Sequence, residues 1–281
     1  MNVIATVEQM RAEAGRARRP LGLIPTMGFL HQGHMSLVRL ARSESETLAA
    51  SIFVNPAQFG PQEDLASYPS DMDADLAKLE GAGVDLVFAP SLDEMYPDGF
   101  DTYVDVGRIG ERLEGEARPG HFRGVATVVC KLLAIVRPDR AYFGQKDVQQ
   151  GMVVTQLTRD LNLGADIVVA PTVREPDGLA LSSRNAYLGT EERRAATVLH
   201  RALLLASDVA AAGAGEIRAR MRRLIESEPL AMLDYVSVAD AATLDELKVV
   251  DRPALVSLAV RIGRSRLIDN MVLQPQDRED R

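Results

Sequence analysis

The sequence predicts an α/β fold, with a doubly wound, Rossmann-like parallel sheet in the N-terminal domain and a smaller α+β domain after it. Two observations predict the first domain: short apolar runs that end at Pro, Gly or Asn, and stretches of helical periodicity between them. Such alternation of buried strands and helices is typical of parallel α/β sheets. A third observation, helices followed by consecutive strands after about Val173, predicts the second domain.

The first half of the chain supplies the elements of the predicted parallel sheet. Strands are expected at Leu21–Thr26, Leu48–Val54, Val84–Ala89, Ala141–Phe143 and Ile167–Val169. Helices are expected at Ser36–Glu46, Asp71–Gly81, Val125–Val136 and Asp147–Leu161. In the second of these helices Met72, Leu76 and Leu79 share one apolar face, and the glycines at 81 and 83 are a stop signal.

The pattern changes after Pro171–Asn185, a segment rich in Pro, Gly and Ser that is the predicted boundary and a possible hinge. Two helices are expected next, at Glu191–Ala212 and Glu216–Glu226. Strands are then expected at Tyr235–Val238, Ala254–Val260 and Arg266–Val272. We therefore predict domains at residues 1–172 and 173–281.

Composition narrows the possible partners. With 32 basic and 40 acidic residues the net charge is −8, which provides no basic footprint for nucleic acid or an anionic membrane. No apolar run approaches the roughly 18 residues of a membrane span, and the N-terminus lacks the apolar core of a signal peptide. We therefore expect no membrane partner and a cytoplasmic location. Cys130, the single cysteine, excludes an intrachain disulfide and is expected in the core.

Two histidines and two glycines follow the first predicted strand. The segment reads Met27-Gly28-Phe29-Leu30-His31-Gln32-Gly33-His34. A strand-to-helix junction presents free N–H groups and a positive dipole end, which favour phosphate, and glycines allow close approach of the backbone. Histidines three apart share a helix face and can donate hydrogen bonds to phosphate or serve as acid and base. The glycine spacing fits neither a Walker A loop nor the dinucleotide fingerprint. The alternative is a glycine-rich turn with two surface histidines.

Three further clusters carry polar groups. Gly144-Gln145-Lys146-Asp147 ends another strand, where a lysine can neutralise charge that develops on phosphate. Leu181-Ser182-Ser183-Arg184-Asn185 offers two hydroxyls and a guanidinium in the predicted hinge, which suit a phosphate clamp. Asn55 and Gln58 lie among aromatic residues and suit a small polar substrate. Taken singly, these clusters could also be a solvated lysine, a capped turn and a polar loop.

Five segments in sequence order resemble the pantothenate synthetase (pantoate–β-alanine ligase) family. They are Pro25–His34, Asn55–Asp64, His121–Val125, Gly144–Gln150 and Ser182–Asn185. The ordered set is more specific than its His-x-Gly-His element, which also occurs in other nucleotidylyltransferases and in class I tRNA synthetases. Two positions depart from the family: Ser70 replaces a usual arginine, and Leu181 replaces a common methionine of similar volume. The charge missing at Ser70 could alter affinity or dimerisation.

The resemblance implies a ligase that uses ATP and Mg²⁺. ATP would lie over Met27–His34, Gly144–Asp147 and Leu181–Arg184, with Val173 near the adenine. The family's proton donor corresponds to His34, which would contact the phosphates together with the catalytic groups His31, Lys146, Ser182, Ser183 and Arg184. Gln58 and Gln150 would bind pantoate, with Gln58 also lining the amine site, and Asp75 matches a position linked to Mg²⁺.

The implied reaction has two steps. Pantoate attacks the α-phosphorus of ATP and releases pyrophosphate, and β-alanine then attacks the acyl adenylate and releases AMP. Small molecules are thus the expected partners, and the family implies a homodimer whose second domain closes over the site.

Two other functions remain open from the residues alone. A nucleotidylyltransferase would attach AMP or CMP to a phosphorylated acceptor and would need no amine. A nucleotide-binding sensor would bind ATP without releasing pyrophosphate. A tRNA synthetase is disfavoured because the chain is short and acidic.

Overall fold

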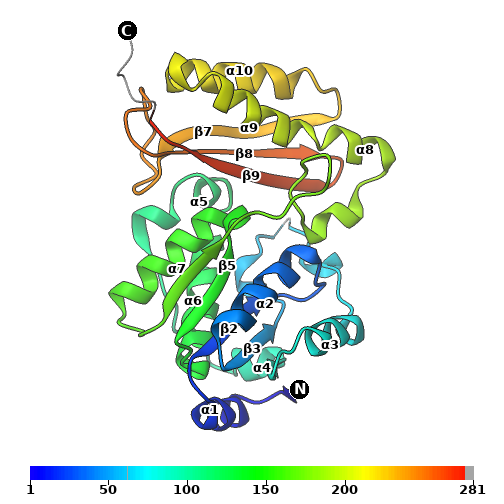
Figure 1. The fold of residues 1–281 in the computed structure, drawn as a ribbon, viewed down its shortest axis with the longest axis vertical. Coiled ribbons are helices and arrows are strands. Elements are labelled where there is room, and N and C mark those ends of the chain that lie inside the picture. Colours follow the sequence, from blue (N-terminus) through cyan, green and yellow to red (C-terminus); the bar gives the residue numbers. More distant parts are fainter. Residues whose placement is uncertain (62, 276–281) are drawn as a thin grey trace. The chain divides into compact units, whose positions relative to one another are not determined.

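The structure, a computed structural model, describes residues 1–61 and 63–275. Its contacts divide the chain into two compact units, Met1–Pro171 and Thr172–Arg281 (Figure 1). This division falls one residue before the boundary expected from the sequence. Residues 276–281 of the predicted second domain, and Gln62 of the Asn55–Asp64 segment, lie outside the described residues.

The first unit is built on a parallel sheet whose strand order is β1-β4-β3-β2-β5-β6. The strands are β1 (Asn2–Ile4), β2 (Leu21–Thr26), β3 (Thr47–Ile52), β4 (Leu86–Phe88), β5 (Arg140–Gly144) and β6 (Asp166–Ala170). From β2 the chain adds β3 and β4 on one side, and later β5 and β6 on the other. The order therefore reverses between β2 and β5, which makes this junction the topological switch point of the sheet.

Helices cover both faces of this sheet, which confirms the doubly wound prediction (Figure 1). One face carries α1 (Val7–Arg16), α6 (His121–Val136) and α7 (Val148–Asp160), and the other carries α2 (Gln32–Glu44) and α3 (Met72–Gly81). Short helices α4 (Leu92–Met95) and α5 (Glu114–Ala117) complete the unit. Successive side chains of a strand point to opposite faces of the sheet, so each strand contributes to both cores. Leu23 of β2 faces the first set of helices, and Ile24 faces the second.

The second unit is an antiparallel sheet of order β7-β8-β9 with helices packed on it, as predicted. Its elements are α8 (Thr190–Ala195), α9 (Val198–Asp208), α10 (Ala214–Glu226), β7 (Ala231–Asp240), β8 (Ala254–Ile262) and β9 (Ser265–Leu273). The prediction of one helix over Glu191–Ala212 is wrong, because α8 and α9 are separated at Ala196 and Thr197. The Thr197 hydroxyl donates to the carbonyl of Arg194 at 2.8 Å, a local bond that competes with a continuous helix.

Cys130 lies on α6 and packs, partly buried, against the core of the first unit. Burial raises the pKa of its thiol above the ordinary value, so the group is a protonated apolar contact at neutral pH. With 16 residues, α6 is the longest helix of the described chain. Among the described residues no helix has both the length and the hydropathy to cross a bilayer.

Candidate active site

Two of the predicted phosphate-binding segments meet at the switch point of the parallel sheet. The segment 27–31, here called the β2 loop, leaves the carboxyl end of β2. The turn Gln145–Asp147, here called the β5 turn, leaves the carboxyl end of the neighbouring strand β5. Parallel neighbours end at the same edge of a sheet, and open α/β sheets bind ligands in the crevice outside that edge at the switch point. The topology therefore places the histidine segment and Lys146 around one site.

The backbone of the segment after β2 is held in an unusual shape by helix α3. Gly28 and Phe29 both have left-handed φ angles, +85° and 51°, and a Cβ atom on Gly28 would lie 3.1 Å from the carboxylate of Asp75. Asp75, which is 1% exposed, accepts the N–H groups of Phe29 at 2.5 Å and Leu30 at 2.7 Å. Lys78 donates to the carbonyl of Leu30 at 2.7 Å. One buried carboxylate thus shapes the loop that leads to the histidines.

The two histidines of this segment cap helix α2 and expose the same ring nitrogen. His31 Nδ1 accepts the N–H of Gly33 at 3.1 Å, and His34 Nδ1 accepts the N–H of His31 at 3.3 Å. The two ring centroids are 4.0 Å apart. A nitrogen that accepts a hydrogen bond carries no proton, so in each neutral ring the proton resides on Nε2. Neither Nε2 has a hydrogen-bond partner within the part of the chain that the structure describes, so both are available as N–H donors to a ligand.

Burial and nearby positive charge keep both rings neutral. Burial, with a contribution from Lys146, lowers the pKa of His31 to about 4. Burial, the adjacent His31 and the charge of Lys146 together lower the pKa of His34 to about 3. The partly buried ammonium of Lys146 lies 3.4 Å from Asp147 Oδ1, whose charge acts in the opposite direction on both rings. The charge of Lys146 acts on both histidines, so the β5 turn and the β2 loop share one electrostatic environment.

The turn after β3 holds Gln58, the predicted pantoate ligand, by its side chain. Asn55 is 1% exposed, and its Nδ2 donates to Gln58 Oε1 at 3.0 Å and to the carbonyl of Gly124 at 3.2 Å. The Asn55 Oδ1 atom accepts the hydroxyl of Tyr96 at 2.8 Å. Gln58 Nε2 lies 3.2 Å from the sulfur of Met27, which connects this turn to the β2 loop. Asn55, predicted to bind substrate, thus uses its side-chain amide in hydrogen bonds with other residues of the protein.

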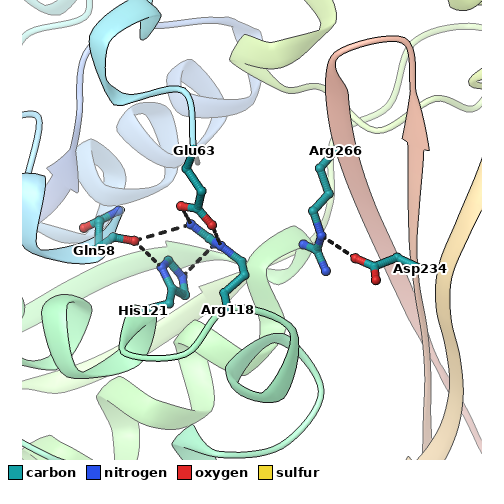
Figure 2. Close-up of polar contacts among 6 residues, drawn as sticks. All are labelled: Gln58, Glu63, Arg118, His121, Asp234 and Arg266. Atoms are coloured by element: carbon teal, nitrogen blue, oxygen red, sulfur yellow. Dashed lines mark hydrogen bonds and ion pairs between the residues drawn. The ribbon is translucent and has the colours of Figure 1, made fainter. Parts of the chain in front are cut away.

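A cluster of three side chains holds the main chain of Gln58 (Figure 2). Arg118 forms two hydrogen bonds with Glu63, at 2.5 and 2.7 Å, and its Nη1 lies 3.0 Å from His121 Nε2. His121 Nδ1 and Arg118 Nη2 both face the carbonyl oxygen of Gln58, at 2.8 and 3.4 Å. Burial and Arg118 lower the pKa of His121 to about 4. Burial alone would raise the pKa of Glu63, but its bonds to Arg118 lower it below the ordinary value.

All four histidines have pKa values below the ordinary value, which predicts that stability falls in mild acid. In the folded protein the pKa values of His31 and His121 are about 4 and that of His34 is about 3, against an ordinary 6.5. Between pH 6.5 and about 4 the unfolded chain therefore binds protons that the folded protein does not, so the free energy of unfolding decreases as pH falls.

Urea unfolding at pH 7 and pH 5 checks this expectation. At pH 5 carboxyl groups of ordinary pKa, near 4, are still mostly ionised, so the histidines dominate the difference. His121→Asn should reduce the pH dependence by removing one titrating group. Equal unfolding free energies at the two pH values would contradict the lowered pKa values.

Two consecutive glutamines of helix α7, Gln149 and Gln150, have different surroundings. Gln149 is 5% exposed, and its Nε2 donates to the carbonyls of Ile109 and Arg112 at 2.8 and 2.7 Å. Its Oε1 accepts the N–H of Glu114 at 3.1 Å. Gln150, the predicted pantoate ligand, is half-buried and makes no such bond among the described residues. Gln149 therefore has a structural role, which leaves Gln150 as the ligand candidate.

In the second unit, the predicted nucleotide-binding residues form one local arrangement. The N–H of Leu181 donates to the carbonyl of Val173 at 3.0 Å, so these two predicted ligands are neighbours. The Ser182 hydroxyl accepts the N–H of Arg184 at 3.3 Å and caps a short 3₁₀ turn, Ser183–Tyr187. The capped turn, which the sequence allowed as the alternative to a phosphate clamp, is therefore present. The Ser182 hydroxyl proton remains able to donate to a ligand.

Two ion pairs involve strand β9 of the second unit, and one of them fixes this arrangement on the sheet. Arg174 pairs with Asp269 of β9, which is 1% exposed, with Nη2 and Oδ1 at 3.0 Å. Arg266 of β9 pairs with Asp234 of β7 at 2.7 Å and so spans the central strand β8 (Figure 2). The first pair anchors the segment that begins at Val173 and leads to Leu181–Arg184.

Comparison with known proteins decides the family. The family model described as pantoate-beta-alanine ligase matches residues 2–272. The chain belongs to the pantoate–β-alanine ligase family. A pantothenate synthetase of Roseiflexus sp. (strain RS-1) is 60% identical over 277 residues, which cover 98% of this chain and all of that protein.

Solved structures of family members share the fold. A crystal structure of pantothenate synthetase from Thermus thermophilus matches with a TM-score of 0.94 at 47% identity, covering 98% of this chain and 100% of that chain. The pantoate-beta-alanine ligase of Francisella tularensis, complexed with beta-gamma ATP and beta-alanine, matches with a TM-score of 0.82 at 35% identity and 97% coverage of both chains. The family and the fold class predicted from the sequence are therefore confirmed.

The prediction that Asp75 binds Mg²⁺ is not supported by its surroundings. Its two oxygens accept backbone N–H groups, and the ammonium of Lys78 lies 3.6 Å away. Among the described residues, no group of three or more His, Cys, Asp or Glu side chains is placed to hold a metal ion. These contacts fit a carboxylate that shapes the β2 loop, and they do not fit a metal ligand.

Replacement of Asp75 is expected to destabilise the protein. Asp75→Ala removes the acceptor of the buried Leu30 N–H, at a cost of about 1–3 kcal/mol, and that of the part-buried Phe29 N–H. Asp75→Asn retains one acceptor oxygen, so it should lose less. Urea unfolding measures both variants. A stable Asp75→Ala variant that differs only in a higher Mg²⁺ requirement would restore the metal-ligand hypothesis.

Proposed function

We propose that the protein condenses pantoate with β-alanine at the expense of ATP, through a pantoyl adenylate, and releases pyrophosphate and AMP. The observation that carries this proposal is the pair of Nε2–H donors of His31 and His34 beside the ammonium of Lys146, at the switch point of the sheet. The family and the ligands named for the Francisella enzyme support it.

The first step makes a mixed anhydride. A carboxylate is a poor electrophile, and attack by its oxygen on the α-phosphorus gives an acyl adenylate with a good leaving group. Such phosphoryl chemistry depends on positioning and charge neutralisation more than on a strong base. Lys146 neutralises charge on the departing pyrophosphate, while the N-terminus of α2 and the two Nε2–H groups bind phosphate oxygens. Mg²⁺ would enter with the ATP substrate and would supply further neutralisation of the phosphate charge.

The histidines act in this proposal as hydrogen-bond donors. At pH 7 a neutral imidazole donates a hydrogen bond but does not release its proton. The predicted role of His34 as proton donor therefore requires bound phosphates to raise its pKa from about 3. Because its Nε2–H is already oriented, the ring binds phosphate oxygen without prior protonation.

The second step joins the acyl group to the amine. β-Alanine attacks the acyl carbon, the C–O bond to the adenylate breaks, and AMP leaves with the phosphate oxygen. Gln58 and Gln150 hold pantoate in this proposal, with Gln58 also lining the amine site. The family resemblance also assigns Val173 and Leu181–Arg184 to ATP binding, in which the hydroxyls of Ser182 and Ser183 would donate to phosphate. The homodimer that the family implies and the cytoplasmic location expected from the sequence belong to the same proposal.

Pyrophosphate exchange into ATP tests the reaction. The assay contains Mg²⁺, with or without pantoate, and no amine. Pantoate-dependent exchange would establish a reversible adenylate, and added β-alanine should then yield AMP and pantothenate. A folded protein that binds ATP but shows no exchange would overturn the proposal and favour the sensor. A nucleotide-containing final product that forms without an amine would favour the nucleotidylyltransferase.

A further inference from the structure

Gln58 is held at two points, and only one of them belongs to its side chain. Asn55 and Met27 contact its amide group, as described above. Its carbonyl oxygen lies 2.8 Å from His121 Nδ1 and 3.4 Å from Arg118 Nη2. A carbonyl oxygen has two lone pairs, so both donors can be accommodated. The main chain at the end of the turn Pro56–Gln58 is therefore fixed independently of the amide.

The guanidinium of Arg118 is the centre of this second contact (Figure 2). Two of its donors meet both oxygens of Glu63, and a third lies 3.0 Å from His121 Nε2. The side chains of Arg118 and Glu63 are 17% and 24% exposed, so solvent screens this pair less than a surface pair. The planar fork of arginine suits such simultaneous contacts, and a lysine could not reproduce them.

His121 transmits the position of Arg118 to Gln58. Its Nε2 accepts a hydrogen bond from Arg118, since guanidinium nitrogens only donate. The ring proton is therefore on Nδ1, which donates to the carbonyl of Gln58. The ring is neutral, so one tautomer satisfies both partners. Glu63 orients Arg118, Arg118 orients His121, and both hold one main-chain oxygen.

We propose that Arg118, with Glu63 and His121, is a positioning residue that sets the affinity for the acid substrate by fixing the main chain of Gln58. This inference rests on the proposed function, in which Gln58 binds pantoate. The cluster is joined to Gln58 through its carbonyl oxygen, so its effect on pantoate passes through the placement of that residue.

Steady-state pyrophosphate exchange of Arg118→Gln tests the proposal. A displacement of a binding group by about 1 Å costs up to about 100-fold, so we expect the pantoate KM to rise about tenfold. The KM for ATP should change much less. Arg11→Gln, at an exposed arginine of α1, is the matched control and should leave both constants unchanged. Urea unfolding reports whether each variant is folded. If Arg118→Gln does not fold, Arg118→Lys replaces it in the test.

Two further comparisons separate positioning from general destabilisation. In a Gln58→Ala background, Arg118→Gln should add little to the pantoate KM, because the group that it positions is gone. His121→Asn keeps an N–H donor near the position of Nδ1, so its pantoate KM should lie closer to wild type than that of His121→Ala.

The outcomes distinguish this inference from the proposed function. Wild-type protein without pantoate-dependent exchange overturns both. Where wild type is active, equal changes in the KM values for ATP and pantoate overturn the inference alone. So do full additivity of Arg118→Gln with Gln58→Ala, and a loss of kcat with both KM values unchanged.

Discussion

Lys146→Ala is expected to lower the rate of adenylate formation by about 100-fold or more, the usual scale for removal of one preorganised electrostatic group. The ammonium lies at the carboxyl end of β5, next to the β2 loop, and lowers the pKa of both His31 and His34. It is the cation through which the first unit would neutralise the departing pyrophosphate. The rate of pantoate-dependent pyrophosphate exchange measures the loss.

The control for this variant is Lys248→Ala, which removes an exposed lysine of the second unit. It should exchange pyrophosphate at the wild-type rate. Removal of Lys146 should also raise the pKa values of His31 and His34, which ring-proton NMR titration can detect. A folded Lys146→Ala protein with near wild-type exchange would remove Lys146 from the catalytic assignment.

His34→Ala is expected to lower adenylate formation by about 100-fold as well, because it removes an Nε2–H donor to phosphate. The substitution also removes the acceptor that caps helix α2, so part of any loss could arise from the loosened helix. The two effects can be separated, since they belong to different nitrogens of the ring.

His34→Asn is the variant that separates them. Its amide oxygen lies near the position of Nδ1 and can accept the N–H of His31, while no atom occupies the position of Nε2. We expect this variant to unfold in urea near the wild-type midpoint and yet to exchange pyrophosphate as slowly as His34→Ala. Near wild-type exchange by His34→Asn would show that the cap, and not the Nε2–H donor, matters for catalysis.

Local patterns predicted much of the first unit. Apolar runs ended by Pro, Gly or Asn located five of its six strands, because parallel strands are buried on both faces. β1 was missed, since it has three residues of which one is buried. Helix α2 begins four residues before its predicted start at Ser36, because its cap is a histidine and not one of the usual Ser, Thr, Asp or Asn caps.

Motif spacing selected the segments proposed to carry the site, but not how they are held. The β2 loop and Lys146 were predicted, and the sheet topology brings them together. Asp75 lies more than 40 positions from the N–H groups that it binds, and Glu63 lies 55 positions from Arg118. No periodicity encodes such pairs, because each results from packing between separate elements. The same holds for the division of labour between Gln149 and Gln150, which follows from the orientation of α7.

The two histidines that cap helix α2 also affect how the protein responds to a change of pH. The main chain of α2, and not the solvent, determines where each ring keeps its proton. With pKa values of about 4 and 3, the free protein takes up no proton at either ring across the neutral range. In the proposed function, donation of a hydrogen bond from Nε2 to a phosphate oxygen therefore needs no proton from the medium across the neutral range.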